Sequence, residues 1–359
     1  MSPYNVLVVD DSIFMRKMIS DLISEDPAFR VIDTAKNGKE ALEKIKTVRP
    51  DVVTMDVEMP IMNGLEALQQ IMKENPTPVI MLSSLTQEGA AETIRALELG
   101  AVDFVRKPSG SISLDIYKVR DALLDKLRLA VKTNMKKMSP NVVQAPPPSI
   151  IKPSVEASPL TQERSIRFNH LVAIGTSTGG PRALHQVLSH IPANFAAPIV
   201  VVQHMPPNFT KSLAQRLDSV SAIRVVEAED GLPLQSGTAY IAPGGMHMVV
   251  VRDGTKAYRV RLTKDEPRSG HRPSVDMLFE SLLPLTELQR HIVLMTGMGS
   301  DGAKGMAALK RSGAVTTIAE SEESCIVYGM PRAAVELQCV TDILPQHLVA
   351  QKLSLVVSS

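Results

Sequence analysis

The feature that most constrains this sequence is an alternation of short apolar runs and amphipathic stretches over residues 5–130. Stretches such as GKEALEKIKTVR and GLEALQQIMKEN carry apolar residues at i, i+3 and i+4, which is typical of helices that bury one face. Strands that alternate with helices predict a parallel, doubly wound sheet covered on both faces. The five strands are expected at Asn5–Asp10, Val31–Ala35, Asp51–Asp56, Pro78–Ser84 and Asp103–Lys107.

A proline-rich segment follows this first unit. The stretch Ile112–Val131 has the pattern of an amphipathic helix, which we expect to close the first domain, although a relay or dimer role is an alternative. Residues 132–165 then lack periodicity and are rich in proline, as in an extended, semi-rigid linker. We therefore expect a domain at residues 1–125, a helix end and linker at 126–165, and a second domain at 166–359.

The second domain repeats the α/β pattern with one addition. The segment HMVVVRDGTKAYRVRLT has two alternating runs around Asp253 and Gly254, which predicts an antiparallel β-hairpin. The remaining pattern predicts a second, larger doubly wound parallel sheet. Its strands are expected at Leu171–Gly175, Pro198–Gln203, Arg224–Glu229, His291–Thr296 and Ala314–Ala319.

Composition excludes several classes of protein. The chain has 39 Lys and Arg against 38 Asp and Glu, no Trp and 3% aromatic residues, which argues against nucleic acid as a partner. Two cysteines are too few for a disulfide framework or a zinc site. The N-terminal sequence is not that of a signal peptide, and no apolar run is long enough to span a bilayer. We expect a cytoplasmic protein that does not insert into membranes.

Acidic side chains gather at predicted strand ends in the first domain. Asp10 and Asp11 follow the first strand, Asp56 the third, Ser83 the fourth and Lys107 the fifth. Because the carboxyl ends of parallel strands meet at one edge, these groups should form one site. Several carboxylates together favour Mg²⁺, and a carboxylate beside it can attack a phosphoryl group. The alternative is that the two N-terminal aspartates only cap the next helix.

This arrangement resembles the receiver domain of bacterial response regulators over residues 1–125. The resemblance implies that Asp56 accepts the phosphoryl group and that Mg²⁺ is bound in this domain. The ligands that it implies are Asp10, Asp11, Asp56 and the backbone carbonyl of Glu58. It further implies that Ser83 and Lys107 contact the phosphoryl group and that Phe104 is the switch aromatic.

A candidate nucleophile follows the first strand of the second domain. The motif Gly175-Thr176-Ser177-Thr178-Gly179 lies between a predicted strand and a predicted helix, which is the spacing of a nucleophile elbow. Such a turn exposes the serine hydroxyl at the edge of the sheet. A turn of small residues, or an anion-binding loop at the helix N-terminus, is the alternative.

The candidate base and acid follow later strands. His204 ends the strand IVVVQ beside the serine, and Asp301 lies after the strand HIVLM, where it could orient the imidazole as in a Ser-His-Asp triad. Five other histidines fall on helices, in probable loops or at an amino strand end: His185, His190, His247, His271 and His291. We therefore expect none of these to be catalytic.

The third motif also allows a competing interpretation. Gly297, Gly299 and Gly302 match G-x-G-x-x-G after a strand, and Glu320 follows at the spacing of a ribose-binding acid. A dinucleotide-binding unit normally opens its domain, whereas this motif lies late in the second domain. That interpretation would also leave Ser177 and His204 without a role, so we favour the hydrolase.

The order Ser…His…Asp differs from the Ser…Asp…His order of α/β-hydrolases. Six motifs instead resemble the chemotaxis protein-glutamate methylesterases, in the same receiver-then-esterase order: GTSTGGPRAL, VVQHMPPNFT, AYIAPGGMHM, HRPSVDMLF, MTGMGSDGAKGM and ESCIVYGMPRAA. The resemblance implies hydrolysis of glutamate γ-methyl esters on chemoreceptor helices, with methanol released, and deamidation of receptor glutamines in many members. It implies no cofactor in the esterase site, and that Thr178 and Met298 line it.

Control by the first domain is expected to operate through access. A histidine kinase would supply the phosphoryl group, and the unphosphorylated receiver would cover the active-site edge. Two alternatives remain at this point: an output domain that only binds a partner, and a DNA-binding output domain. The near-neutral charge and the lack of a helix-turn-helix pattern disfavour the second.

Overall fold

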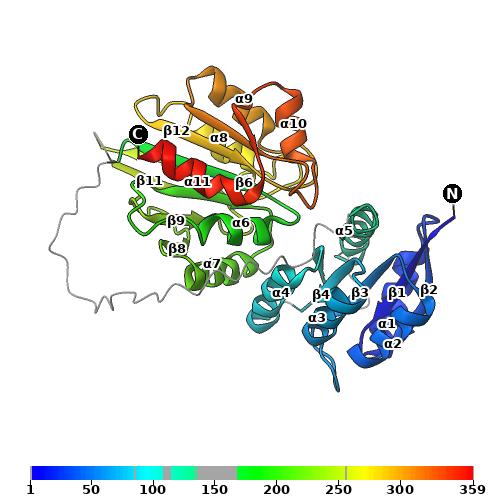
Figure 1. Cartoon of the computed structure of the whole chain (residues 1–359). Helices are drawn as coiled ribbons and strands as arrows, with labels where there is room; N and C mark the ends of the chain where they lie inside the picture. The colour runs from blue at the N-terminus through cyan, green and yellow to red at the C-terminus, as the bar shows by residue number, and fades with distance from the viewer. Residues whose placement is uncertain are drawn as a thin grey trace, which may run out of the picture.

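The computed structural model describes residues 2–84, 86–107, 115–133, 135, 168–254 and 257–358. These residues form two α/β units, which Figure 1 shows side by side. Most of the linker predicted at residues 132–165 lies outside the described residues. The helix predicted before it is α5 (Asp115–Ala130), and the first residues of that prediction also lie outside the described part.

The N-terminal unit is a five-stranded parallel sheet in the order β2-β1-β3-β4-β5. All five predicted strands are present, with ends that differ by one or two residues. The strands are β1 (Tyr4–Val9), β2 (Phe29–Ala35), β3 (Val52–Asp56), β4 (Val79–Ser83) and β5 (Asp103–Arg106). The helices between them are α1 (Ile13–Ser24), α2 (Gly38–Val48), α3 (Gly64–Glu74) and α4 (Gln87–Leu99).

Alternate residues of each strand face opposite helical layers. On β1, Val6 and Val8 pack into the cluster that contains residues of α1 and α5, whereas Leu7 and Val9 pack toward α2, α3 and α4. All four side chains are fully buried. Burial on both faces explains why the strand is a continuous apolar run and not an alternating one.

The C-terminal unit contains a seven-stranded parallel sheet in the order β14-β13-β12-β6-β7-β9-β8. Its strands are β6 (His170–Thr176), β7 (Ile199–Gln203), β8 (Arg224–Glu227), β9 (Thr238–Ile241), β12 (Gln289–Leu294), β13 (Thr316–Glu320) and β14 (Asp342–Leu344). Its helices are α6 (Gly180–Leu188), α7 (Phe209–Val220), α8 (Val275–Ser281), α9 (Ala303–Arg311), α10 (Met330–Glu336) and α11 (Gln346–Val357).

The predicted hairpin is confirmed as β10 (His247–Asp253) paired antiparallel with β11 (Ala257–Thr263). Two strands were not predicted, β9 and β14. Each has at most four residues, which is too short for a periodicity to stand out from a loop.

The order of the strands indicates where in the second sheet a ligand would bind. The sheet is built outward from β6 in both directions, through β7 on one side and β12 on the other. In open parallel sheets, ligands bind at the carboxyl ends of the strands where the order reverses. The loops that carry the candidate serine, histidine and aspartate follow β6, β7 and β12, respectively.

The two units meet along α4 and β5 of the first and α6 and α7 of the second (Figure 1). Phe104 of β5 stacks on Phe209 of α7, with 4.5 Å between ring centroids and 23° between ring planes. At the edge of this contact, Arg216 pairs with Glu98. The hydrophobic core of the first unit therefore continues into the second.

Candidate active site and phosphorylation site

The turn that presents Ser177 is held by an unpredicted residue, Gln203. Its side-chain amide donates to the backbone carbonyls of Ser177 and His204, at 2.9 and 3.2 Å, and its carbonyl oxygen accepts from Thr176 at 2.7 Å. A Cβ at Gly180 would lie only 1.9 Å from that oxygen, so the glycine is required by this close approach. The final residue of β7 thus ties the serine turn to the histidine loop.

His204 and Asp301 form a buried pair. Nε2 of His204 lies 2.8 Å from Oδ2 of Asp301, and the two side chains are 6% and 2% exposed. The carboxylate also accepts from the hydroxyl of Ser274 and from the backbone N–H groups of Val275 and Asp276, at 2.7–3.0 Å. Every oxygen of the acid is therefore fixed by the first turn of α8.

Opposing effects act on the pKa of Asp301. Burial alone would raise it, but the hydrogen bond and charge of His204, together with the backbone donors of Asp276 and Val275, lower the pKa to about 2. The acid is therefore a carboxylate at any physiological pH, as a group that stabilises an imidazolium must be.

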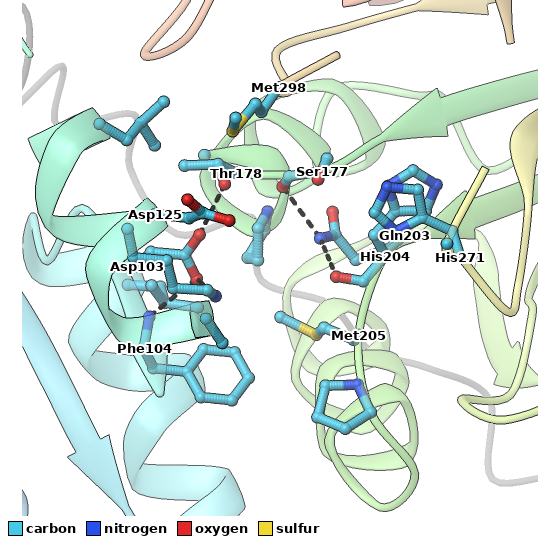
Figure 2. Close-up of a pocket in the computed structure, with 18 of the residues that line it drawn as sticks. Asp103, Phe104, Asp125, Ser177, Thr178, Gln203, His204, Met205, His271 and Met298 are labelled. Atoms are coloured by element: carbon cyan, nitrogen blue, oxygen red, sulfur yellow. Dashed lines mark hydrogen bonds and ion pairs between the residues drawn. The ribbon is translucent and has the colours of Figure 1, made fainter. Parts of the chain in front are cut away.

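Ser177 and His204 line the same cavity, of about 390 Å³ (Figure 2). Since Nε2 is bonded to Asp301, only Nδ1 of His204 is left to take the serine proton. This nitrogen is buried and has no hydrogen-bond partner among the described residues. The structure thus brings the serine and histidine to one cavity without a direct hydrogen bond between them, an arrangement common before substrate binds.

His271, which the sequence placed in a loop without a role, lies on His204. The two imidazole rings are stacked with 3.8 Å between centroids and 8° between planes (Figure 2). His271 begins the motif HRPSVDMLF, whose serine, Ser274, caps α8 and donates a hydrogen bond to Asp301. This motif could have indicated that His271 lies near the site. His271 therefore lines the cavity beside the candidate base, although its predicted place in a loop gave no sign of this.

The two predicted lining residues both border this cavity. Met298 is 53% exposed at the rim. The hydroxyl of Thr178 donates to Oδ2 of Asp103 in the N-terminal unit at 2.6 Å (Figure 2). That unit supplies part of the wall, through Leu97, Asp103, Phe104, Ala122, Asp125, Lys126 and Leu129.

The glycine-rich loop after β12 supports the serine turn and not a nucleotide. Carboxylate oxygens of Glu320 accept from the backbone N–H of Thr296 and from the hydroxyl of Ser324, both at 2.8 Å, in a fully buried position. A Cβ at Gly297 would lie 2.7 Å from the Cβ of Ser177. The acid that a ribose would need is thus engaged inside the protein, and the glycine is needed for packing.

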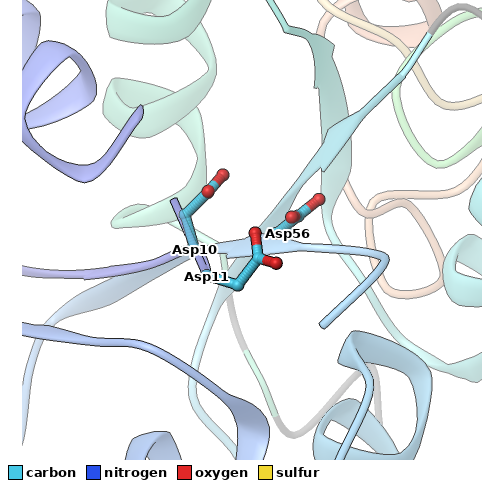
Figure 3. A group of neighbouring side chains, drawn as sticks. All are labelled: Asp10, Asp11 and Asp56. Carbon is cyan, nitrogen blue, oxygen red and sulfur yellow. The ribbon is translucent and has the colours of Figure 1, made fainter. Parts of the chain in front are cut away.

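The aspartate cluster of the N-terminal unit is confirmed as a spatial cluster. One carboxylate oxygen from each of Asp10, Asp11 and Asp56 lies within 4.8 Å of the others (Figure 3). Nζ of Lys107 lies 2.8 Å from Asp10 and 2.6 Å from Asp56. The N-cap of α1 is Ser12, whose hydroxyl accepts from Met15, so the helix-capping interpretation of the two aspartates is wrong.

The electrostatics of this cluster favour a cation. Burial raises the pKa of Asp56 to about 6, with Lys107 acting in the opposite direction and Asp10 and Asp11 adding to the rise. A cavity of about 440 Å³ beside it is lined by Asp11, Asp56, Glu58 and Lys107, among others. Hard oxygen donors around an open space fit Mg²⁺, the ion that receiver domains generally hold in an acidic pocket.

The two remaining predicted switch residues, Ser83 and Phe104, are in contact with other parts of the structure. The hydroxyl of Ser83 accepts from Thr93 at 2.7 Å and donates to the backbone carbonyl of Gly89 at 3.3 Å. Phe104 is 4% exposed because it is covered by Phe209. Both residues are therefore engaged with α4 or with the second unit in this conformation.

Among the described residues, none of the helices has the length and apolarity that crossing a bilayer requires.

Comparisons with known proteins agree with this arrangement. Residues 172–353 match the CheB methylesterase family, and residues 6–116 match the response regulator receiver domain. The protein-glutamate methylesterase/protein-glutamine glutaminase of Geobacillus kaustophilus is 54% identical over 350 residues, which cover 98% of this chain and 97% of that protein. The protein of the same name from Bacillus subtilis is 48% identical and covers 94% of each chain.

A solved structure is similar in sequence and fold to the second unit. The catalytic domain of the Thermotoga maritima CheB methylesterase has 42% sequence identity and a TM-score of 0.51, and it covers 52% of this chain and 98% of that chain. These matches favour a catalytic second domain over one that only binds a partner. The chain therefore belongs to the CheB methylesterase family, with a response regulator receiver domain ahead of the methylesterase domain.

Proposed function

We propose that this methylesterase hydrolyses glutamate γ-methyl esters on the cytoplasmic helices of chemoreceptors, and that it also deamidates receptor glutamines. The relatives are named for both activities. The observation that carries the assignment of residues is the buried His204–Asp301 pair, which lies beside Ser177 at the reversal of strand order. Ser177 would be the nucleophile, His204 the base and Asp301 the orienting acid.

The first half of the reaction forms an acyl-enzyme. The Oγ of Ser177 attacks the ester carbonyl while Nδ1 of His204 takes its proton. The tetrahedral intermediate then expels methoxide, which takes that proton from His204 and leaves as methanol. Asp301 stabilises the transient imidazolium through Nε2. A glutamyl ester of Ser177 remains.

The second half regenerates the enzyme. Water attacks the acyl carbonyl, His204 takes a proton from it and returns that proton to Ser177, and the glutamate side chain is released. With a glutamine substrate, ammonia leaves in place of methanol.

Two backbone N–H groups are candidates for oxyanion donors. Those of Ser177 and Gly297 are already bonded, to the carbonyls of Thr296 and Val327. Those of Thr178 and Met298 donate to no acceptor among the described residues, and both border the cavity. We assign them to the developing oxyanion, where such donors act most strongly in catalysis.

Control would act through the shared wall of the cavity. In the conformation described, the receiver covers one side of the site through Asp103, Phe104 and α5. A histidine kinase would phosphorylate Asp56, with Mg²⁺ held by Asp10, Asp11, Asp56 and the carbonyl of Glu58. When bound, the ion neutralises phosphoryl oxygens. Ser83 and Lys107 would then turn to the phosphoryl group, which would shift the receiver away from Ser177.

With these roles, we assign residues 1–125 to the receiver domain, 126–165 to the connection and 166–359 to the catalytic domain. We place the protein in the cytoplasm. The test is methanol release from methylated receptor membranes, with and without acetyl phosphate as phosphodonor. Ser177→Ala should lower the rate by at least about 10³-fold, because a serine hydrolase loses most of its rate without its nucleophile. Substantial methanol release by this variant would refute the assignment.

The access model has its own test. A chain of residues 166–359 should be faster than the unphosphorylated full-length protein and should ignore the phosphodonor. Equal rates for the two proteins would contradict control by covering the site. The Thermotoga maritima catalytic domain was solved alone, which supports the use of such a fragment.

A further inference from the structure

One hydrogen bond does not fix the orientation of His204. The ring is tethered through its Cβ and bonded through Nε2 to Asp301, but it can still rock about the line that joins Cβ and Nε2. Such a swing would carry Nδ1 away from Ser177, and small misplacements of a reacting group cost large factors in rate. The ring plane must therefore be fixed by another contact, and the broad face of His271 supplies it at 3.8 Å between centroids.

The loop that carries His271 is built as a tight turn. Arg268 and His271 exchange backbone hydrogen bonds at 2.9 and 3.0 Å, and the residues between them, Ser269 and Gly270, both have positive φ, at 53° and 80°. Positive φ at both central positions is the requirement of a type I′ turn. A serine in this conformation is uncommon, so the turn geometry is imposed by its surroundings.

Two arginine side chains anchor this turn. The guanidinium of Arg268 pairs with Glu280 of α8, with one N–O distance of 2.6 Å. That of Arg272 donates to the backbone carbonyls of Lys264 and Asp265, both at 3.1 Å. Both flanking cations are thus engaged, and the ring between them is held by a rigid frame.

His271 is uncharged at neutral pH. Burial lowers its pKa to about 4, His204 contributes in the same direction, and Asp301 acts in the opposite one. A neutral ring can lie against His204 whether that residue is neutral or protonated, whereas two cations at this distance would repel each other.

Resting on the function proposed above, we propose that His271 is a positioning residue for His204. It is a flat, neutral platform that keeps Nδ1 of His204 directed at Ser177, shields the ring from water, and exchanges no proton itself. Its contribution is therefore the shape of its ring and its lack of charge.

The test compares three substitutions in the full-length protein with a phosphodonor present. His271→Ala removes the platform, His271→Phe restores a flat neutral ring, and His271→Lys adds a fixed charge. The readouts are kcat and KM for methanol release from methylated receptor membranes, the pH profile, and the rate at which a fluorophosphonate labels Ser177. His347→Ala, an exposed histidine at the start of α11, is the matched control.

We expect His271→Ala to lower kcat and the labelling rate about 10-fold with KM changed less than about 2-fold. His271→Phe should recover at least about a third of the loss on a logarithmic scale. His271→Lys should be the slowest of the three, and the acid limb of its pH profile should move to lower pH, because a fixed cation opposes the imidazolium.

Two results would overturn the proposal. If Phe is as slow as Ala, His271 acts through its own proton; if Ala raises KM alone, it contacts substrate instead. Should His271→Ala fail to fold, Arg268→Ala loosens the same turn from outside, and an unchanged labelling rate would then count against the proposal. Retained methanol release in Ser177→Ala would instead refute the proposed function, independently of His271.

Discussion

The hydroxyl of Thr178, the residue after the candidate nucleophile, donates a hydrogen bond of 2.6 Å to Asp103 of the receiver domain. Asp103 is 7% exposed and also accepts from Lys126 at 2.6 Å. The side-chain hydroxyl next to Ser177 in the sequence is thereby bonded to the receiver domain. This hydrogen bond links the receiver domain directly to the turn that carries the candidate nucleophile.

Removal of the Asp103 carboxylate should weaken the docking of the receiver domain over the active site. Asp103→Ala should raise methanol release by the unphosphorylated protein about 3- to 10-fold, since a hydrogen bond to a charged group contributes about 1.5–3 kcal/mol and part of it is recovered in water. Stimulation by acetyl phosphate should shrink in proportion. Asp121→Ala, on the exposed side of α5 where it pairs with Arg120, is the control. An unchanged basal rate in Asp103→Ala would show that this contact does not restrain the receiver.

The Phe104–Phe209 stack should couple the two domains energetically. A double-mutant cycle with Phe104→Ala and Phe209→Leu, read out as basal methanol release, should give a coupling of about 0.5–1.5 kcal/mol. Each single variant should raise the basal rate, and the double variant should add less than the sum. Strict additivity would mean that the rings touch without contributing to docking.

The carboxylate of Asp301 should be essential for activity. Asp301→Asn should lower kcat by about 10³-fold or more, because an amide would face the imidazole with the wrong hydrogen-bonding pattern. The depressed pKa also adds to stability above pH 3.8, and this contribution is lost as the pH falls toward 2. Acid unfolding followed by circular dichroism should therefore start at higher pH in the variant. A wild-type rate would remove Asp301 from the mechanism.

Asp56 should destabilise the receiver in the absence of cations. Its raised pKa means that the folded state binds the proton more tightly than the unfolded state, so the favourable contribution at low pH is lost as the pH rises through about 6. Asp56→Asn should therefore raise the unfolding free energy at pH 7.5 by about 1–3 kcal/mol in EDTA. Thermal unfolding measures this difference.

Added Mg²⁺ should narrow that difference, because it stabilises the wild-type cluster more than the variant. An Asp56→Asn protein that is less stable than wild type in EDTA would contradict the electrostatic account of the cluster.

A histidine pair lies at the amino ends of β6 and β12, away from the candidate active site. We expect it to make the stability of the methylesterase domain sensitive to acid. His291 is fully buried, and its Nε2 lies 3.0 Å from Nδ1 of His170. Burial lowers the pKa of His291 to about 4, with His170 adding to the effect. The unfolded state thus binds more protons between pH 6.5 and 4, and stability should fall by up to about 3 kcal/mol as the pH drops through that range.

Calorimetry of the methylesterase transition from pH 7 to 4.5 checks this expectation. His291→Gln should flatten the pH dependence, whereas the exposed His190→Ala should leave it unchanged. An equal slope in His291→Gln and wild type would assign the acid sensitivity to other groups.

The two sheets were predictable because their strands are buried on both faces. The runs of β1 and β7 are mostly apolar and too short for a helix. Because helical patterns alternate with them, such runs predict buried parallel strands. Short strands at the sheet edge, such as β14, make few contacts and leave no comparable pattern. Their existence depends on pairing with a neighbour that a local pattern does not contain.

The candidate site was predictable where a residue type that acts in catalysis follows a strand, and not where a residue acts by packing or by supporting a turn. Ser177, His204 and Asp301 follow three strands that the topology makes neighbours. His271 and Gln203 carried no such signal: one depends on a turn between the hairpin and α8, the other on a contact across two loops. The contact between Thr178 and Asp103 was also beyond local patterns, because it joins residues of two units that lie far apart in the sequence.

The shared wall of the catalytic cavity has a consequence for the order of events in the cell. If the receiver and the receptor compete for the same space, each must weaken the binding of the other by the same factor. A receptor helix seated at Ser177 would then leave the receiver displaced and its Asp56 more readily phosphorylated. The substrate would thus activate its own enzyme. The rate of the enzyme would then depend on both the density of receptors and the activity of the kinase.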